Sequence, residues 1–459
     1  MKLSAKIYNV WIHRKRRQLS ATKVIALTFF SIILLGSILL TLPVASRSGQ
    51  PCSFLDALFT ATSATCVTGL VMFDTWTQWS GFGQAVILCM IQLGGLGFMS
   101  AAALVIFLLR KRVGLKQRMV MAQALSLTDM ESVVKLQKLV LTGSFTIEGI
   151  GALILMLRFW PVYGLRKAVI MGIFHAVSAF CNAGFDILGF ITPDASLLEV
   201  NSDPVVLLTL GMLVILGGLG FFVWEEVTRL RSFRKCSVYT KLVLLTSGAL
   251  LLAGTVGFLL LEWNNPATLG NMSVGDKLLN AWFQSVTTRT AGFDALGQGG
   301  LTDGSKGLAI VLMMIGGSSG STAGGIKTVS FVVILLFLWA RARGRSEVTV
   351  FRRSVPAGQV MDAMTIAGIM ILLALVGTVV ICATSPVGFV DAMYEASSAL
   401  ATVGLTAGAT RQLSLVAKLL IIVFMYFGRV GILTISLGFL MGDKAESRFR
   451  YANTNLLIG

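Results

Sequence analysis

Four glycines at similar intervals, each ending a short segment rich in small residues, constrain this chain more than any other feature. Gly69 lies in TCVTGL, Gly184 in FCNAGF, Gly292 in TRTAGF and Gly404 in ATVGL. The upstream segments FLDALFTATSATCVTGL (54–70) and FVDAMYEASSALATVGL (389–405) match without gaps at Phe, Asp-Ala, Ala, Ser-Ala and Gly-Leu. The third segment departs most, with Val286 where the others have Ser. The chain is therefore predicted to consist of four related units.

Each glycine lies between two long apolar segments. The first segments cover about 24–44, 136–157, 242–261 and 363–382, and the second about 82–109, 205–224, 307–340 and 415–440. About 20 apolar helical residues cross a ~30 Å hydrocarbon core, so the roughly ten to twelve residues before each glycine cover only about half of it. Each short segment is expected to re-enter from the side that it left. We predict an all-α polytopic membrane protein with eight transmembrane helices and four re-entrant pore helices around a central pore.

Composition and charge agree with a membrane protein. The chain is 55% hydrophobic and only 13% charged, against about 25% charged residues in soluble domains. Its formal net charge of +17 arises from clusters at 14–17, 110–118, 229–241, 341–353 and 444–450, which lie between apolar segments rather than on one face. Lys and Arg of this kind mark cytoplasmic loops, with Arg158, Arg166 and Lys167 as exceptions. We therefore predict that both termini are cytoplasmic, that the first apolar segment is retained, and that no nucleic acid is bound.

The predicted organisation follows the four units. It comprises a cytoplasmic N-terminus (1–23), repeat 1 (24–118), repeat 2 (119–235), repeat 3 (236–345), repeat 4 (346–445) and a C-terminal tail (446–459).

The segments around the glycines have the chemistry of a cation filter. Backbone carbonyls replace the hydration shell of a monovalent cation, glycine permits backbone angles barred to other residues, and pore-helix C-termini direct negative partial charge toward the ion. The predicted ion-binding residues are Cys66, Val67, Thr68, Gly69, Cys181, Asn182, Ala183, Gly184, Arg289, Thr290, Ala291, Gly292, Thr402, Val403 and Gly404, with potassium held by their carbonyls. Arg289 is expected to brace its loop rather than face ions.

Carboxylates flank these segments at both ends. Asp56 and Asp391 lie near the starts of two predicted pore helices, where we expect them to act as caps. Asp74, Asp186 and Asp294 follow filter glycines. Two interpretations remain open for these three: they concentrate cations at the outer mouth, or they are ordinary solvated loop residues.

The second apolar segment of the third unit contains a break, GGSSGSTAGGI (316–326). Glycine and other small polar residues hold a helix poorly, and broken helices at membrane depth border cavities. We predict a mobile gating loop below the filter, formed by Gly316, Gly317, Ser318, Ser319, Gly320, Ser321, Thr322, Ala323, Gly324 and Gly325. Lys327 and the intramembrane Arg429 are its predicted charged partners, since a buried charge in a membrane segment is a functional candidate. Arg429 is expected either to bond loop carbonyls or to repel cations.

The same segment is one residue away from a phosphate-binding loop, G-x-x-x-x-G-K-T. Ile326 stands where that loop needs Lys, within a membrane-length apolar segment. With two histidines in the chain and no nucleophile–base pair, an enzyme is not predicted.

The four segments TCVTGL, SAFCNAGFD, TTRTAGFD and ATVGLT resemble those of the potassium transporter superfamily that includes Trk, Ktr and plant HKT proteins. One span before the first pore loop is similar to Ktr membrane subunits. The resemblance implies potassium uptake at the bacterial plasma membrane by a homodimer in the lipid bilayer, controlled by a cytoplasmic ring of nucleotide-binding RCK subunits. It also implies a gating role for the loop of repeat 3.

The resemblance leaves the ion preference open between two readings. In plant relatives, serine at the first filter glycine accompanies sodium transport, so Gly69 favours potassium, with sodium as an activator or co-ion. The alternative is a Trk-like or sodium-permeable cation transporter of the same fold.

Overall fold

The computed structural model describes residues 21–97 and 130–431, and nearly all of its regular structure is helical. The α-helices are α2 (Ala21–Thr41), α3 (Phe54–Thr65), α4 (Thr75–Gln78), α5 (Gly81–Leu96), α8 (Met130–Tyr163), α9 (Leu165–Phe180), α10 (Pro204–Leu219), α11 (Phe221–Leu230), α12 (Val238–Glu262), α13 (Val274–Thr287), α14 (Asp303–Met314), α15 (Thr328–Ala342), α16 (Ala357–Thr384), α17 (Phe389–Ala401) and α18 (Leu415–Val430). The two-residue strands β1 (Thr349–Val350) and β2 (Arg353–Ser354) form an antiparallel hairpin.

The first long helix of each predicted unit is confirmed. The helices α2, α8, α12 and α16 are long and apolar enough to cross a membrane. Each exposes large apolar side chains along its length, for example Leu252 and Leu372, as expected for helices that face the hydrocarbon core of a membrane.

Each long helix is followed by a shorter one that ends at a filter glycine segment. These shorter helices are α3, α9, α13 and α17, which we call the pore helices after their predicted role, and each packs against the long helix before it. The last turn of each is buried or nearly so, and small residues (Ala, Ser and Thr) are frequent there, most of all in α3 and α17. Small side chains let the four helix ends approach one another closely.

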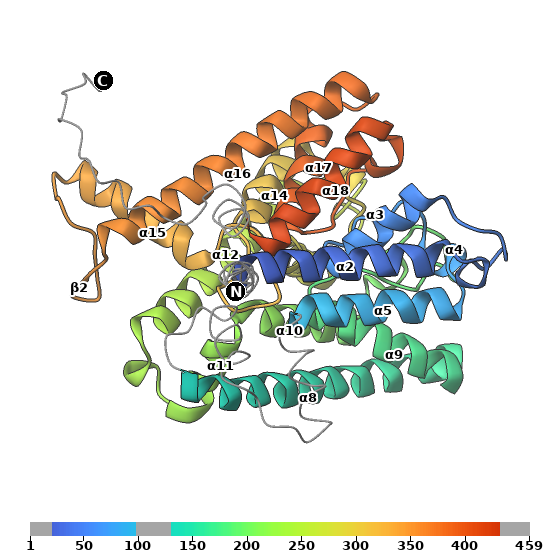
Figure 1. Cartoon of the computed structure of the whole chain (residues 1–459), viewed down its shortest axis with the longest axis horizontal. Helices are drawn as coiled ribbons and strands as arrows, with labels where there is room; N and C mark the ends of the chain where they lie inside the picture. The colour runs from blue at the N-terminus through green and yellow to red at the C-terminus, as the bar shows by residue number, and fades with distance from the viewer. Residues whose placement is uncertain (1–20, 98–129, 432–459) are drawn as a thin grey trace, which may run out of the picture.

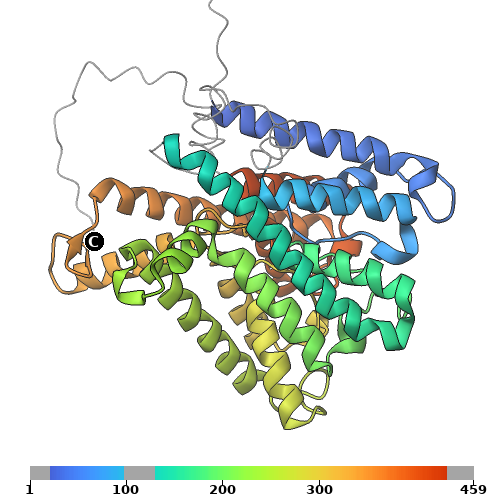
Figure 2. The same cartoon turned by 90° about the horizontal axis from the view of Figure 1, so that it is seen from below.

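The four units close into a ring. The helix after each filter packs against the pore helix of the next unit: α5 on α9, α10 on α13, α14 on α17 and α18 on α3. Figure 1 accordingly shows α16 and α18 of the fourth unit on the opposite side from α8 and α9 of the second. In Figure 2 the yellow-green and yellow helices of the third unit lie opposite the blue α2 of the first.

Ion pairs join the units in this ring and correct one prediction. Asp56 does not cap α3, whose N-cap is Ser53, and Asp391 does not cap α17, whose N-cap is Gly388. Both carboxylates lie in the first turn, where their negative charge interacts favourably with the positive end of the helix dipole. The Nζ of Lys418 lies 3.4 Å from Asp56 Oδ1, and the Nζ of Lys306 lies 2.7 Å from Asp391 Oδ1.

The helices after the filters are shorter than predicted. The predicted segment 205–224 is helical but sharply bent: α10 ends at Leu219, Gly220 has φ 91°, and α11 continues at an angle of 94°. In the same way α5 ends at Gly97 and α18 at Gly431, with φ 79° and 92°. A left-handed glycine is a common helix stop, since other residues are strained there. The predicted break in the third unit is confirmed between α14 and α15.

Several predictions fall outside the described residues. These are the cytoplasmic N-terminus, the basic clusters at 14–17, 110–118 and 444–450, the ends of the segments 82–109 and 415–440, and the C-terminal tail.

Candidate functional site

The four predicted filter segments, 66–69, 181–184, 289–292 and 402–404, are loops, and we call them the filter strands. They share one backbone pattern. In each, the residue two before Gly69, Gly184, Gly292 or Gly404 also has a positive φ: Val67 (56°), Asn182 (59°), Thr290 (69°) and Thr402 (53°). Left-handed backbone is uncommon for such residues and costs of order 1–3 kcal/mol unless the surroundings impose it. Alternation of left- and right-handed residues turns successive peptide planes, so that carbonyls of one strand can share a direction. The repetition of this uncommon conformation in four segments indicates that the surrounding structure imposes it, as at a functional site.

The four glycines form a closed ring. A Cβ added at Gly69 would lie 2.6 Å from the carbonyl oxygen of Ala183, and one at Gly184 would lie 2.5 Å from that of Ala291. In the same order, a Cβ at Gly292 would overlap the Val403 carbonyl, and one at Gly404 the Thr68 carbonyl. Each glycine thus abuts the carbonyl of the next unit, and the fourth returns to the first.

A hydroxyl one turn below each filter fixes its geometry. Ser63 and Ser398 accept the N–H of Gly69 and Gly404, both at 3.0 Å. Ser178 donates to the Phe185 carbonyl at 2.6 Å, and Thr287 donates to the equivalent Phe293 carbonyl at 2.7 Å.

Thr287 explains why the third sequence segment aligns poorly. The hydroxyl is shifted by one residue, and the backbone tightens with it. Ala291 N donates to the carbonyl of Thr287, four residues back, whereas Thr68 N reaches Ser63, five residues back. Sequence alignment with one gap would have found this residue.

A cavity of about 370 Å³ opens beyond the glycine ring, and we call it the vestibule. All four filter glycines line it, together with Asp74, Asp186, Asp194, Asp294 and Arg411. Among these described lining residues, four carboxylates face one guanidinium, and Arg411 is paired with Asp194. The vestibule therefore carries net negative charge, which raises the local concentration of cations.

The carboxylates predicted from the sequence also hold the vestibule wall. Asp294 accepts the N–H groups of three successive residues, 296–298, and the side-chain amide of Gln298. Asp74 caps α4 through Thr77 N at 2.7 Å. Asp186 makes one such bond, to Leu188 N at 3.1 Å. Of the three carboxylates, Asp186 therefore accepts the fewest backbone N–H groups of the vestibule wall.

Asp186 predicts a pH dependence. Burial among the vestibule loops, reinforced by the charge of Asp74, raises the pKa of Asp186 to about 6. An acid with a raised pKa is charged above that value and neutral below it. Lowering the external pH from about 7.5 to about 5.5 should therefore raise the potassium KM roughly threefold.

The measurement is initial uptake against potassium concentration at both pH values. D186N should show the higher KM at both, while the exposed Asp303→Asn variant should behave as the wild type. An unchanged pH response in D186N would mean that another group titrates.

The gating loop (316–326) lies on the opposite side of the filter from the vestibule. Thr322 Oγ1 donates to the carbonyl of Phe180, the last residue of α9. A Cβ at Gly324 would overlap Thr402 Oγ1 and approach the Ala401 carbonyl at 2.8 Å. Ser318 N and Thr322 N donate to carbonyls at the end of α10. The loop thus touches the inner ends of the second and fourth pore helices.

The three predicted basic residues all bond backbone carbonyls. Arg429 donates to the Thr322 carbonyl of the gating loop and to the Gly94 and Gly95 carbonyls at the end of α5, the last at 2.9 Å. Lys327 Nζ donates to the Ala323 carbonyl at 2.7 Å. Arg289 reaches the Gly316 carbonyl at 3.3 Å and Ser247 on α12. The side chain of Arg289 therefore braces the loop, and only its backbone is available to the filter.

A glycine motif missed in the sequence explains how the helices after the filters fit. The segments QLGGLGF (92–98) and ILGGLGF (215–221) are nearly identical. A Cβ at Gly94, Gly217 or Gly428 would overlap the carbonyl of Thr65, Phe180 or Leu400, at the ends of the three pore helices. Arg429 follows Gly428 where Gly95 and Gly218 follow theirs. The fourth unit thus places a guanidinium where two other units have glycine.

The reading of the sequence also missed an acid at membrane depth. Glu148, on α8, is 4% exposed and accepts the amide of Gln92 at 3.0 Å. The thiol of Cys181 points toward Gln92 Oε1 at 3.7 Å and Glu148 Oε1 at 3.9 Å. The side chain of Cys181 is thus engaged by Gln92 and Glu148, which leaves only its backbone for the predicted carbonyl role.

Comparison with known proteins adds four findings. Residues 10–448 match the TrkH family, described as cation transport proteins. The chain is 40% identical to the Ktr system potassium uptake protein B of Bacillus subtilis, over 95% of this chain and 96% of that protein. It is 39% identical to the potassium/sodium uptake protein NtpJ of Enterococcus hirae, over 97% and 99%. The crystal structure of the potassium transporter TrkH from Vibrio parahaemolyticus has the same fold, with a TM-score of 0.71, 19% identity and coverage of 93% and 86%.

Proposed function

This chain belongs to the TrkH family of cation transport proteins, and from that premise we propose that it takes up potassium across the bacterial plasma membrane through its four filter strands. The observation that carries the proposal is the closed glycine ring, in which each of the four glycines abuts a backbone carbonyl of the next unit. Backbone carbonyls in such a ring replace the water around a potassium ion. Eight spans, with four re-entrant pore helices and both termini cytoplasmic, are the topology that we propose.

The second candidate function is combined potassium and sodium uptake. NtpJ, whose name states potassium and sodium, is 39% identical to this chain, nearly as similar as the Bacillus potassium protein at 40%. The two functions differ in how strongly the filter discriminates between ions, or in sodium acting as an activator or co-ion.

Radiotracer uptake into proteoliposomes that contain the purified chain separates these candidates. At matched gradients, potassium entering at least about tenfold faster than sodium supports the first proposal, since a factor of ten corresponds to ~1.4 kcal/mol between ions. Comparable rates support the second. If neither the folded wild-type protein nor a folded variant without residues 316–326 passes either ion, both proposals are overturned, and empty liposomes provide the baseline.

We also propose that the gating loop closes the pathway and that a partner opens it. The resemblance to Ktr subunits points to a homodimer on a cytoplasmic ring of nucleotide-binding RCK subunits. Growth rescue of a potassium-uptake-deficient bacterium, with and without a ring subunit, tests this control. Equal rescue in both strains would exclude it.

A further inference from the structure

One face of each pore helix carries a polar residue three positions before its filter hydroxyl. Thr60, His175, Gln284 and Glu395 precede Ser63, Ser178, Thr287 and Ser398 by three residues each. A spacing of three places both side chains on one face of a helix. All four residues are almost completely buried, between 0% and 2% exposed.

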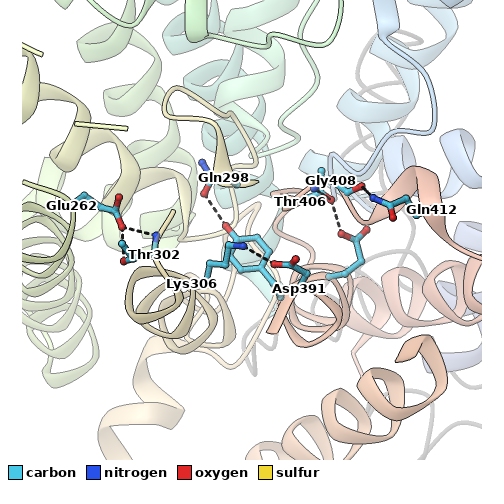
Figure 3. Close-up of polar contacts among 10 residues, drawn as sticks. Glu262, Gln298, Thr302, Lys306, Asp391, Thr406, Gly408 and Gln412 are labelled. Atoms are coloured by element: carbon cyan, nitrogen blue, oxygen red, sulfur yellow. Dashed lines mark hydrogen bonds and ion pairs between the residues drawn. The ribbon is translucent and has the colours of Figure 1, made fainter. Parts of the chain in front are cut away.

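In three of the four units the residue at this position bonds the segment that follows the filter glycine. In unit 4, Glu395 accepts hydrogen bonds from the hydroxyls of Thr406 and Thr410, each at 2.6 Å. Thr406 lies two residues after Gly404, and both threonines line the vestibule. Figure 3 shows Thr406 at the end of this bond.

The third unit makes the same connection with amides. Gln284 donates to Gln298 Oε1 at 2.6 Å and accepts from Gln298 Nε2 at 3.1 Å. Gln298 also donates to Asp294, two residues after Gly292, at 2.7 Å. Tyr394 of α17 donates to the same Gln298 at 2.8 Å, and Figure 3 shows this contact, which links the third and fourth units.

The second unit uses an imidazole. His175 Nδ1 faces the Met171 carbonyl at 2.8 Å, and Nε2 faces the N–H of Ile187 at 3.4 Å. A neutral ring protonated on Nδ1 satisfies both contacts. Ile187 lies three residues after Gly184. The first unit differs, because Thr60 donates to Asp56 in its own helix.

We propose that Glu395, Gln284 and His175 are positioning residues of the filter, each holding the outer end of one filter strand against its own pore helix. The strand is then fixed on both sides: below by the serine or threonine one turn away, and above by this bond. Glu395 has the largest role, because it holds two residues of the following loop, Thr406 and Thr410, whereas Gln284 and His175 each hold one. This inference rests on the proposed cation transport.

The test is the Glu395→Met variant, which keeps the length of the side chain approximately and removes both acceptors. The potassium-to-sodium uptake ratio should fall about tenfold and the potassium KM should rise, while maximal uptake changes less. A merely structural loss would lower the amount of folded protein at an unchanged ratio and KM. The matched control is Thr60→Val, at the same helix position without a bond to the vestibule, which should keep the wild-type ratio.

Substitutions on the other side of the bond guard against a variant that does not fold. T406V and T410V together should reproduce the lower ratio, and adding Glu395→Met to them should change it little further, because all three remove one interaction. If Glu395→Met does not accumulate, T406V alone decides, since Thr406 is only half-buried. A wild-type ratio in the folded variants overturns this inference alone, whereas absence of cation uptake both in the wild type and in the variant without residues 316–326 overturns the proposed function.

Discussion

Replacing Gly404 by alanine is expected to abolish selective potassium uptake, with transport falling by at least about a hundredfold. Two effects combine. The added Cβ would overlap the Thr68 carbonyl and lie 2.8 Å from Gly69 Cα, so backbone of the neighbouring strand must move. The φ of 98° is also left-handed, which costs a residue with a Cβ about 1–2 kcal/mol.

The control isolates the overlap from the backbone strain. Gly49 also has a left-handed φ, 71°, but a Cβ there would meet nothing within 4 Å. Gly49→Ala should therefore fold and transport as the wild type, apart from a small loss of thermal stability. Radiotracer uptake with purified, monodisperse variants is the measurement. Normal, selective uptake by Gly404→Ala would contradict the carbonyl ring.

Gly69→Ser separates selectivity from rate at the same ring. Its Cβ would press on the Ala183 carbonyl at 2.6 Å, and the hydroxyl adds an oxygen beside the axis. We expect residual flux with at least about a tenfold loss of potassium preference, a change of ~1.4 kcal/mol between ions. Intact preference would show that the first strand contributes less than the other three.

Deleting residues 316–326 is expected to give the second large effect, raising potassium flux at least about tenfold when no partner ring is present. The structure makes this deletion practical. Ile315 and Ile326 lie side by side in a parallel bridge, and Gly316 N donates to the Ile326 carbonyl at 2.9 Å. Ile315 can therefore be joined to Lys327 with little movement. Unchanged low flux in the folded variant would refute the barrier.

Substitutions of Arg429 decide how the loop is held. Arg429→Ala removes its bonds to Thr322 and to the end of α5, and should raise flux several-fold. Arg429→Lys keeps the charge, but an ammonium cannot span both sets of carbonyls as the planar guanidinium does. If bonding holds the loop, lysine behaves like alanine; if repulsion of cations closes the path, lysine behaves like the wild type. Arg158 forms an ion pair with Asp203 away from the loop. The Arg158→Lys variant therefore controls for the loss of a guanidinium elsewhere in the chain.

From the sequence we predict the membrane class, the four units, the filter glycines and the break at 316–326. Each of these depends on local chemistry: apolar length against bilayer thickness, and glycine where no Cβ fits. Thr287 and the GGLG segments carried readable signals as well, although they become visible only when the units are aligned with a gap.

Which groups of different units contact one another is visible only in the tertiary structure. Asp56 and Asp391 act through lysines of the preceding units in the ring, Arg429 through carbonyls of α5 and of the loop between α14 and α15, and Glu395 through a loop beyond its own filter. These contacts join residues far apart in the chain, and their partners are often backbone carbonyls, which every residue possesses. A carbonyl leaves no mark in the sequence, so only the folded ring shows which ones receive a charge.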